Sequence, residues 1–105
     1  MDAVLEKFLR GLKDLGLRNR IERIYLFGSR AKGRERPSSD YDLLIVSPHP
    51  DKGLKSKLYD IVVDLLLETQ RVVSLKIFPS AEFRRLRRMQ TPFMQNVLKE
   101  GVRIG

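Results

Sequence analysis

Apolar residues along the chain follow two different periods, which predict alternating helices and strands. Residues 2–18 place apolar side chains three and four positions apart, as in an amphipathic helix, and Asp2 stands where an N-cap is expected. Residues 54–69 repeat this spacing and give the strongest helix prediction. The apolar face predicted for that helix consists of Leu54, Leu58, Ile61, Val62, Leu65 and Leu66. Short apolar runs predict strands at 21–27, 41–47 and 72–78.

The last quarter of the chain predicts two short helices and a final strand. Ser80 has the position of an N-cap for a basic helix that runs to about residue 89. Thr91 and Pro92 look like the cap and first residue of a helix that ends near Glu100, and residues 102–104 can add an edge strand. The order of elements predicts an α+β fold, a small mixed β-sheet with helices packed on it. With 105 residues the chain is expected to form one domain, residues 1–105.

Composition narrows the class of protein. The chain has no cysteine, which excludes disulfides and thiolate metal sites and agrees with a cytoplasmic location. No apolar run approaches the roughly 20 residues that span a bilayer, and no signal peptide is recognisable at the N-terminus. We therefore expect a cytoplasmic protein without a membrane segment.

The charge of the chain is strongly basic, with a formal net charge of +8 and a pI near 10.2. Such a surface attracts nucleic acid, an acidic protein or a nucleotide. Arg84, Arg85, Arg87 and Arg88 crowd into one segment, and the sequence leaves open whether this is a solvated face or a partner surface. An acidic stripe at helical spacing is predicted to be a solvated helix face; its members are Asp60, Asp64 and Glu68.

One motif lies between the first two predicted strands. Residues 28–42 are GSRAKGRERPSSDYD, a Gly-Ser pair followed by ten residues and an Asp-x-Asp. Apolar residues 24–27 precede it and residues 43–46 follow it. The pattern brings a phosphate-sized turn and two carboxylates to the ends of neighbouring strands, which indicates metal-dependent phosphoryl transfer.

Each part of the motif has a chemical interpretation. Asp40 and Asp42 lie two residues apart at the start of a strand, so their side chains share one face. Two close carboxylates repel each other unless a cation lies between them, and such oxygen ligands suit Mg²⁺. Gly28 lets the backbone approach a ligand or adopt a positive φ. Ser29 offers a hydroxyl and an N–H group to an anion, and Arg30 adds positive charge for a triphosphate.

Either half of the motif has an ordinary structural explanation when it is taken alone. A Gly-Ser pair after a strand is usually a turn, and Asp-x-Asp is often a solvated strand entrance. Their joint occurrence between two apolar strands favours the functional interpretation.

The segment resembles the minimal nucleotidyltransferases (MNT) of the DNA polymerase-beta superfamily. The resemblance rests on Gly28, Ser29, Asp40 and Asp42, on Arg30, Ala31 and Gly33 inside the turn, and on Ser39 before the first aspartate. The end of the chain, residues 92–102, resembles the closing helix and short strand of that family, so that the likeness covers nearly the whole chain. It implies Mg²⁺-dependent transfer of a nucleoside monophosphate from a triphosphate such as ATP. It also implies a HEPN-domain protein as partner, in a toxin–antitoxin arrangement.

The chain departs from that family's pattern at one position. The superfamily's site usually has a third carboxylate, on the strand after the long helix, but residues 71–78 contain no Asp or Glu. Ser74 and Lys76 share one face of this predicted strand. If that face is turned toward Asp40 and Asp42, Ser74 takes the place of the third carboxylate and Lys76 neutralises the pair. The alternative is that Ser74 is simply a half-buried strand residue without a role in the site.

Three functions compete on this evidence. The first is an enzyme that moves a nucleotidyl group, AMP from ATP, to a hydroxyl on a protein partner, with Asp40 and Asp42 holding the metal and Gly28, Ser29 and Arg30 the phosphates. The second is a binding module, catalytically weak or inactive, that neutralises its partner by occlusion. A nucleic-acid-binding protein is the third and is not expected, because no helix-turn-helix, zinc or aromatic signature is present. The oligomeric state stays open between a homodimer and a hetero-oligomer.

Overall fold

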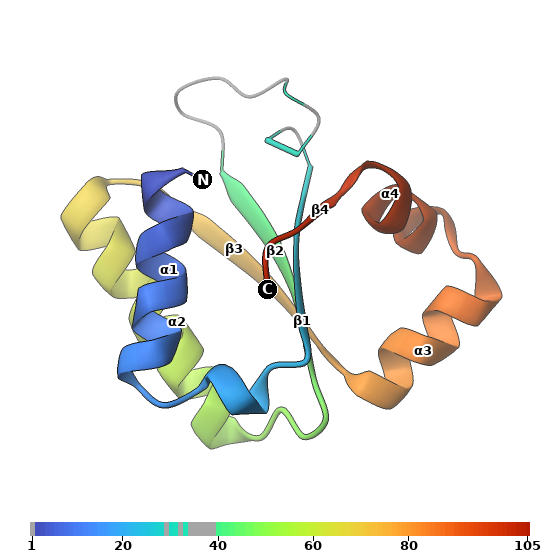
Figure 1. Cartoon of the computed structure of the whole chain (residues 1–105), viewed down its shortest axis with the longest axis horizontal. Coiled ribbons are helices and arrows are strands. Elements are labelled where there is room, and N and C mark those ends of the chain that lie inside the picture. Colours follow the sequence, from blue (N-terminus) through green and yellow to red (C-terminus); the bar gives the residue numbers. More distant parts are fainter. Residues whose placement is uncertain (1, 29, 32, 34–39) are drawn as a thin grey trace.

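A four-stranded mixed sheet lies between two pairs of helices (Figure 1). In chain order the elements are α1 (Ala3–Asp14), the 3₁₀ helix η1 (Arg18–Arg20), β1 (Arg23–Phe27), β2 (Tyr41–Ser47), α2 (Lys52–Thr69), β3 (Val73–Pro79), α3 (Ser80–Met89), α4 (Pro92–Glu100) and β4 (Val102–Arg103). The computed structural model describes residues 2–28, 30–31, 33 and 40–105. Helices α1 and α2 cover one face of the sheet and α3 and α4 the other, which confirms the predicted α+β fold.

Strand β2 occupies an inner position in the sheet, whose order is β3-β2-β1-β4. It pairs antiparallel with β1 and parallel with β3, while β4 pairs antiparallel with the other side of β1. Because side chains alternate along a strand, β2 supplies apolar residues to both faces. Leu43 and Ile45 face α1 and α2, whereas Leu44 and Val46 face α3 and α4, and all four are fully buried.

Two apolar clusters result, one on each face of the sheet. The cluster under α1 and α2 consists of Val4, Leu5, Phe8, Leu12, Leu17, Ile24, Leu26, Tyr41, Leu43, Ile45, Leu54, Leu58, Ile61, Leu65 and Val73. The smaller cluster under α3 and α4 consists of Tyr25, Leu44, Val46, Phe83, Met94 and Val97. Burial of apolar surface in these two layers supplies most of the driving force for folding.

The first helix is shorter than the sequence pattern predicts. Asp2 caps its N-terminus as expected, since its Oδ1 accepts the N–H of Val4 at 2.7 Å. The helix ends at Asp14 rather than near residue 18, because Gly16 adopts a positive φ of 68° and turns the chain away. The next few residues form η1, so β1 begins at Arg23 and not at residue 21.

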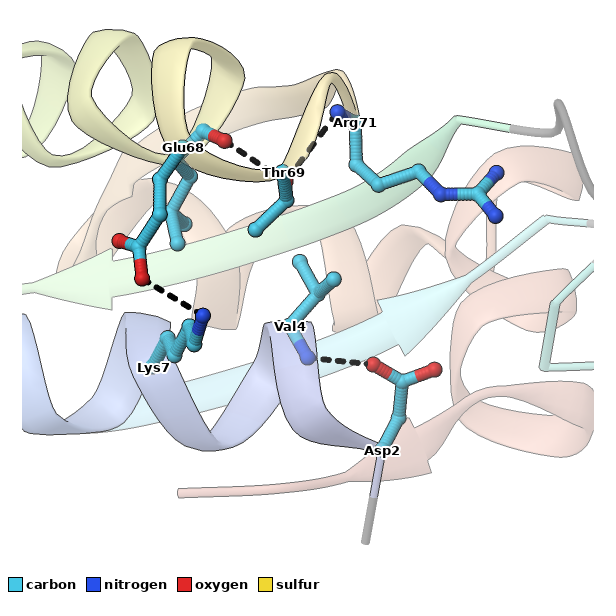
Figure 2. Close-up of polar contacts among 7 residues, drawn as sticks. Asp2, Val4, Lys7, Glu68, Thr69 and Arg71 are labelled. Atoms are coloured by element: carbon cyan, nitrogen blue, oxygen red, sulfur yellow. Dashed lines mark hydrogen bonds and ion pairs between the residues drawn. The ribbon is translucent and has the colours of Figure 1, made fainter.

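Helix α2 begins two residues earlier than the apolar period predicts. Asp51 is its N-cap and accepts the N–H of Leu54 at 2.8 Å, which extends the helix back to Lys52. The prediction that Leu66 belongs to the apolar face is wrong, because this residue is 43% exposed. The acidic stripe is solvent-exposed as predicted, and Figure 2 shows how Lys7 of α1 reaches its last member, Glu68, with Nζ 2.6 Å from Oε1.

The starts of the last two helices differ in how well the sequence predicts them. Thr91 caps α4 by accepting the N–H of Met94 at 3.2 Å, with Pro92 in the first turn, as predicted. Ser80 is not the cap of α3 but its first residue. Its hydroxyl instead donates to Oε2 of Glu22, 2.8 Å away. Within the described part of the chain, the helices are too short or too polar to cross a membrane.

The two leucines Leu58 and Leu67 of α2 provide a direct test of this packing. Leu58 is fully buried, whereas Leu67 is 78% exposed. Leu58→Ala is expected to lower the free energy of unfolding by about 2–5 kcal/mol, because it leaves a cavity between α2 and the sheet. Leu67→Ala on the same helix should change it by less than about 0.5 kcal/mol. Urea unfolding followed by circular dichroism measures both, and equal losses would contradict the assigned face of α2.

Candidate functional site

Asp42 and Gly28 approach each other closely where β1 ends and β2 begins. Asp42 is the second residue of β2 and is paired with Phe27, the last residue of β1. Gly28 follows with a φ of +77°, and a Cβ at this position would lie only 2.5 Å from Oδ2 of Asp42. A side chain on residue 28 would therefore collide with the carboxylate. Glycine is required here both for the left-handed turn and for the room that Asp42 occupies.

The Asp42 carboxylate lies in an environment that disfavours its charge. Burial raises the pKa of Asp42, and the neighbouring charge of Asp40 raises it further, while Lys76 acts in the opposite direction. The net effect is a pKa above the ordinary value for aspartate. Two carboxylates held together in this way form a set of oxygen donors that a divalent cation would stabilise.

The third strand brings Ser74 and Lys76 to the same face as Asp42. In the parallel pairing of β2 with β3, Ser74 is the partner of Asp42 and Lys76 is the partner of Leu44. Partners in a parallel pair project to the same side of the sheet. Ser74 thus stands beside Asp42, at the position where the resemblance leads one to expect a third carboxylate. The part of the chain that the structure describes contains no cluster of three or more metal-binding His, Cys, Asp or Glu side chains.

A group of aromatic rings lies on this face, against α4. Phe93 of α4 makes edge-to-face contacts with Phe27, with centroids 5.5 Å apart, and with Phe78, at 6.5 Å. The ammonium group of Lys76 lies 6.0 Å from the centre of the same Phe93 ring. The three rings form an apolar surface on the face that carries Asp42, and Lys76 lies against it.

A small cavity of about 130 Å³ opens next to this apolar surface, between the end of β1 and α4. It is lined by Phe27, Gly28, Phe93, Asn96, Val97, Glu100 and Gly101. A larger cavity, about 570 Å³, lies between α3 and α4 and involves none of the motif residues. The carboxylate pair, rather than cavity size, identifies the candidate site, because there two carboxylates lie next to a glycine turn at the ends of neighbouring strands.

Tyr41, between the two aspartates, points to the opposite face and ties the motif to α1. Its hydroxyl donates to Oδ2 of Asp2 at 2.6 Å, so that the N-cap of α1 also holds the start of β2. The guanidinium carbon of Arg30 lies 3.9 Å from the centre of the Tyr41 ring. Arg30 is therefore placed over Tyr41, and its charge acts on Asp2 and Tyr41.

The acid–base properties of this pair follow from the contact between them. Burial by itself would raise the pKa of Asp2, but the hydrogen bonds from Tyr41, Val4 and Leu5 and the charge of Arg30 outweigh it and lower the pKa. Burial, together with the hydrogen bond to Asp2 and its charge, raises the pKa of Tyr41. The hydrogen bond therefore favours an ionised Asp2 and a neutral Tyr41. Figure 2 shows the Asp2 end of this arrangement at the N-terminus of α1.

The remaining sequence predictions fall elsewhere. Ser29 lies outside the described residues. The arginines of the basic cluster are exposed on α3, where Arg85 pairs with Glu82 at 2.8 Å and Arg87 lies 6.0 Å from the Phe83 ring. Met94 of α4 is buried in the core, whereas Met89 at the end of α3 is 59% exposed.

Sequence reasoning missed two parts of the arrangement. The first is the contact between Tyr41 and Asp2, which are 39 residues apart. The alternation of β2 indicates that Tyr41 faces away from the carboxylates, but not that it meets the cap of α1. The second is Phe93, which the sequence suggests only as a core or interface residue, and whose position beneath Lys76 depends on how α4 packs on the sheet.

The chain is similar to known proteins in sequence. A family model described as a nucleotidyltransferase domain matches residues 5–103. The chain is 35% identical over 106 residues to a protein of Methanocaldococcus jannaschii named "Putative protein adenylyltransferase MJ0604", and the match covers 95% of this chain and 93% of that protein.

Solved structures show the same fold. A toxin–antitoxin crystal structure with AMP-PNP superposes with a TM-score of 0.61 at 23% identity, covering 93% of this chain and 69% of the other. A variant of the toxin–antitoxin MntA-HpeT gives a TM-score of 0.61 at 22% identity, covering 96% and 71%. At this level of identity the likeness establishes the fold.

The approach of Gly28 to Asp42 predicts an unequal response to two glycine substitutions. Gly16 has a similar φ of +68° but nothing within 4 Å of the position of a Cβ. Gly16→Ala should cost about 1–2 kcal/mol from left-handed strain alone. Gly28→Ala should cost about 1–3 kcal/mol more, because Asp42 must move. Denaturant unfolding of the two variants checks this, and equal losses would show that residue 28 has room for a side chain.

The contact between Tyr41 and Asp2 predicts a pH-dependent loss of stability. Tyr41→Phe should lower the free energy of unfolding by about 1 kcal/mol near neutral pH, because Asp2 loses its donor. A carboxylate whose pKa is lowered by folding stabilises the fold above its unfolded pKa and ceases to do so as the pH falls through the folded value. The difference from wild type should therefore shrink in acid. Tyr59→Phe, at a tyrosine 47% exposed on α2, is the control and should be neutral throughout; a matching loss there would refute the assignment.

Proposed function

Since the chain belongs to the nucleotidyltransferase domain family, we propose that it transfers AMP from ATP, with Mg²⁺, to a hydroxyl group on a protein partner. The Methanocaldococcus jannaschii relative, whose name describes a protein adenylyltransferase, supports a protein acceptor. The observation that carries the proposal is the position of Asp42, fixed against Gly28 and accompanied by Asp40, where two neighbouring strands meet the turn.

Asp40 and Asp42 would hold the metal. Their chemistry suits Mg²⁺, because both side chains are oxygen donors. Burial and the charge of Asp40 raise the pKa of Asp42, so a bound cation would relieve the repulsion between the two carboxylates. When bound, Mg²⁺ would neutralise charge on the phosphates during transfer. Transfer itself breaks the bond between the α-phosphorus and the bridging oxygen of ATP, forms a bond to the acceptor oxygen, and releases pyrophosphate and the acceptor's proton.

The phosphates would be received at the turn, by Gly28 and Ser29. Gly28 presents backbone without a side chain at this point. Arg30 would help indirectly, since its stacking on Tyr41 ties the turn to the start of β2 and adds positive charge beside it. The phosphate-binding roles of Gly28 and Ser29, the indirect role of Arg30 and the metal-binding roles of Asp40 and Asp42 are all part of the proposal.

The partner would be a HEPN-domain toxin, with this chain as its antitoxin. The minimal nucleotidyltransferases that the motif resembles pair with such proteins, and the two solved structures described above are toxin–antitoxin structures. A net charge of +8 would favour an acidic surface on the partner.

A second function is favoured by Ser74. With serine beside Asp42, the site has two carboxylates instead of three, which weakens catalysis more than nucleotide binding. The chain would then act as an antitoxin that binds nucleotide but silences its partner by occlusion.

Label transfer separates these two functions. With ATP labelled at the α-phosphate, Mg²⁺ and the product of the adjacent gene, wild type should label the partner, and EDTA should abolish labelling. Asp42→Asn should lower the rate by a factor of about 100 or more, because the carboxylate that would hold the metal is lost. Asp60→Asn, at an exposed aspartate of α2, should leave the rate unchanged.

Two outcomes would decide against enzymatic activity. Absence of transfer by wild type, or equal transfer by Asp42→Asn, would sink the transferase proposal. If a variant with both Asp40→Ala and Asp42→Ala still silences the partner in cells, the occlusion mechanism is the correct one.

A further inference from the structure

Lys76 lies on the same face of the sheet as the carboxylate pair. The parallel register aligns Asp42 with Ser74 and Leu44 with Lys76, so the lysine stands one alternate position further along β3. Its positive charge lies close enough to act on the Asp42 carboxylate. The strand thus presents a neutral hydroxyl and a cation to the site, and no carboxylate.

The ammonium group of Lys76 also has a defined position, over an aromatic ring. Its Nζ lies 6.0 Å from the centre of the Phe93 ring, and Phe93 is itself held edge-on by Phe27 and Phe78. An ammonium group over an aromatic face is attracted to it, which favours this rotamer over a fully solvated one. Residues of β1, β3 and α4 therefore together hold a positive charge beside Asp42.

This arrangement is unsuited to a pair of metal ions. Two-metal sites need carboxylates that bridge or flank both ions. On β3 the position beside Asp42 carries the Ser74 hydroxyl in place of a carboxylate, and a second cation bound there would also be repelled by Lys76. The ammonium group is already a cation with three donors, able to contact a phosphate oxygen as a point charge.

We propose that the site takes one divalent cation with each nucleotide, and that Lys76 supplies the positive charge that a second metal ion would otherwise contribute. This inference rests on the proposed function, because it presupposes that Asp40 and Asp42 bind a metal–nucleotide complex. It adds a residue on β3 to the nucleotide site and a fixed metal count.

The metal count can be measured without catalysis. Mn²⁺ is titrated into the protein with a non-hydrolysable ATP analogue, with protein in excess so that all nucleotide is bound, and free Mn²⁺ is followed by electron paramagnetic resonance. Wild type should bind one Mn²⁺ per nucleotide. Two per nucleotide would overturn the inference while leaving the proposed function standing. If neither Mn²⁺ nor the analogue binds, the proposed function fails, and this inference with it.

Variants of β3 test the role of each side chain. The double variant Ser74→Asp/Lys76→Met supplies the missing carboxylate and removes the competing charge, and should bind two Mn²⁺ per nucleotide. Lys76→Met alone should bind one and hold the analogue roughly tenfold less tightly, whereas Lys76→Arg should retain wild-type affinity.

Folding and remote charge are controlled separately. Ser74 and Lys76 are both solvent-exposed, so thermal unfolding should show that these variants fold like wild type. Lys55→Met, on exposed α2, removes an equal charge away from the site and should leave affinity unchanged. Equal affinities for Lys76→Met and wild type, or an unchanged count of one in the double variant, would overturn the role of Lys76.

Discussion

Strand β2 is hydrogen-bonded on both sides and covered on both faces, and every other element is positioned by this constraint. Its alternation sends Leu43 and Ile45 into one apolar cluster and Leu44 and Val46 into the other. A slip of one residue in its pairing would exchange the two sets and push Asp42 into the cluster under α1 and α2. The register that the core enforces is therefore the same register that delivers the carboxylate to the turn.

The start of β2 is secured from both sides of the sheet. On one side Asp42 fills the space that Gly28 leaves by having no side chain. On the other, Tyr41 binds the N-cap of α1 and carries Arg30 on its ring. The consecutive residues Tyr41 and Asp42 thus have different roles. Asp42 places its carboxylate at the candidate site, and Tyr41 fixes the backbone that holds it. Such double anchoring limits the reorganisation that binding would require.

Much of this arrangement follows from the sequence. Period and turn residues predict the α-helices and strands of the described residues, but not the 3₁₀ helix η1. Strand alternation predicts that Ser74 and Lys76 share a face, which the register with Asp42 confirms. Errors occur where local signals compete. Ser80 looks like a cap, but its hydroxyl donates to Glu22, 58 residues away in the sequence. Leu66 fits the apolar period but is 43% exposed. Local patterns do not encode packing between distant segments. Two contacts depend on such packing: the hydrogen bond between Tyr41 and Asp2, and the position of Lys76 over Phe93.

The two faces of β3 have unequal importance for folding. Val73 is buried in the core, whereas Ser74 and Lys76 are solvent-exposed on the opposite face. Substitutions at these exposed positions meet little resistance from the core. Under the proposed function, one or two changes on this single strand could therefore alter catalysis while the scaffold persists. Along this seven-residue strand, the residues that would matter for catalysis therefore alternate with those that matter for folding.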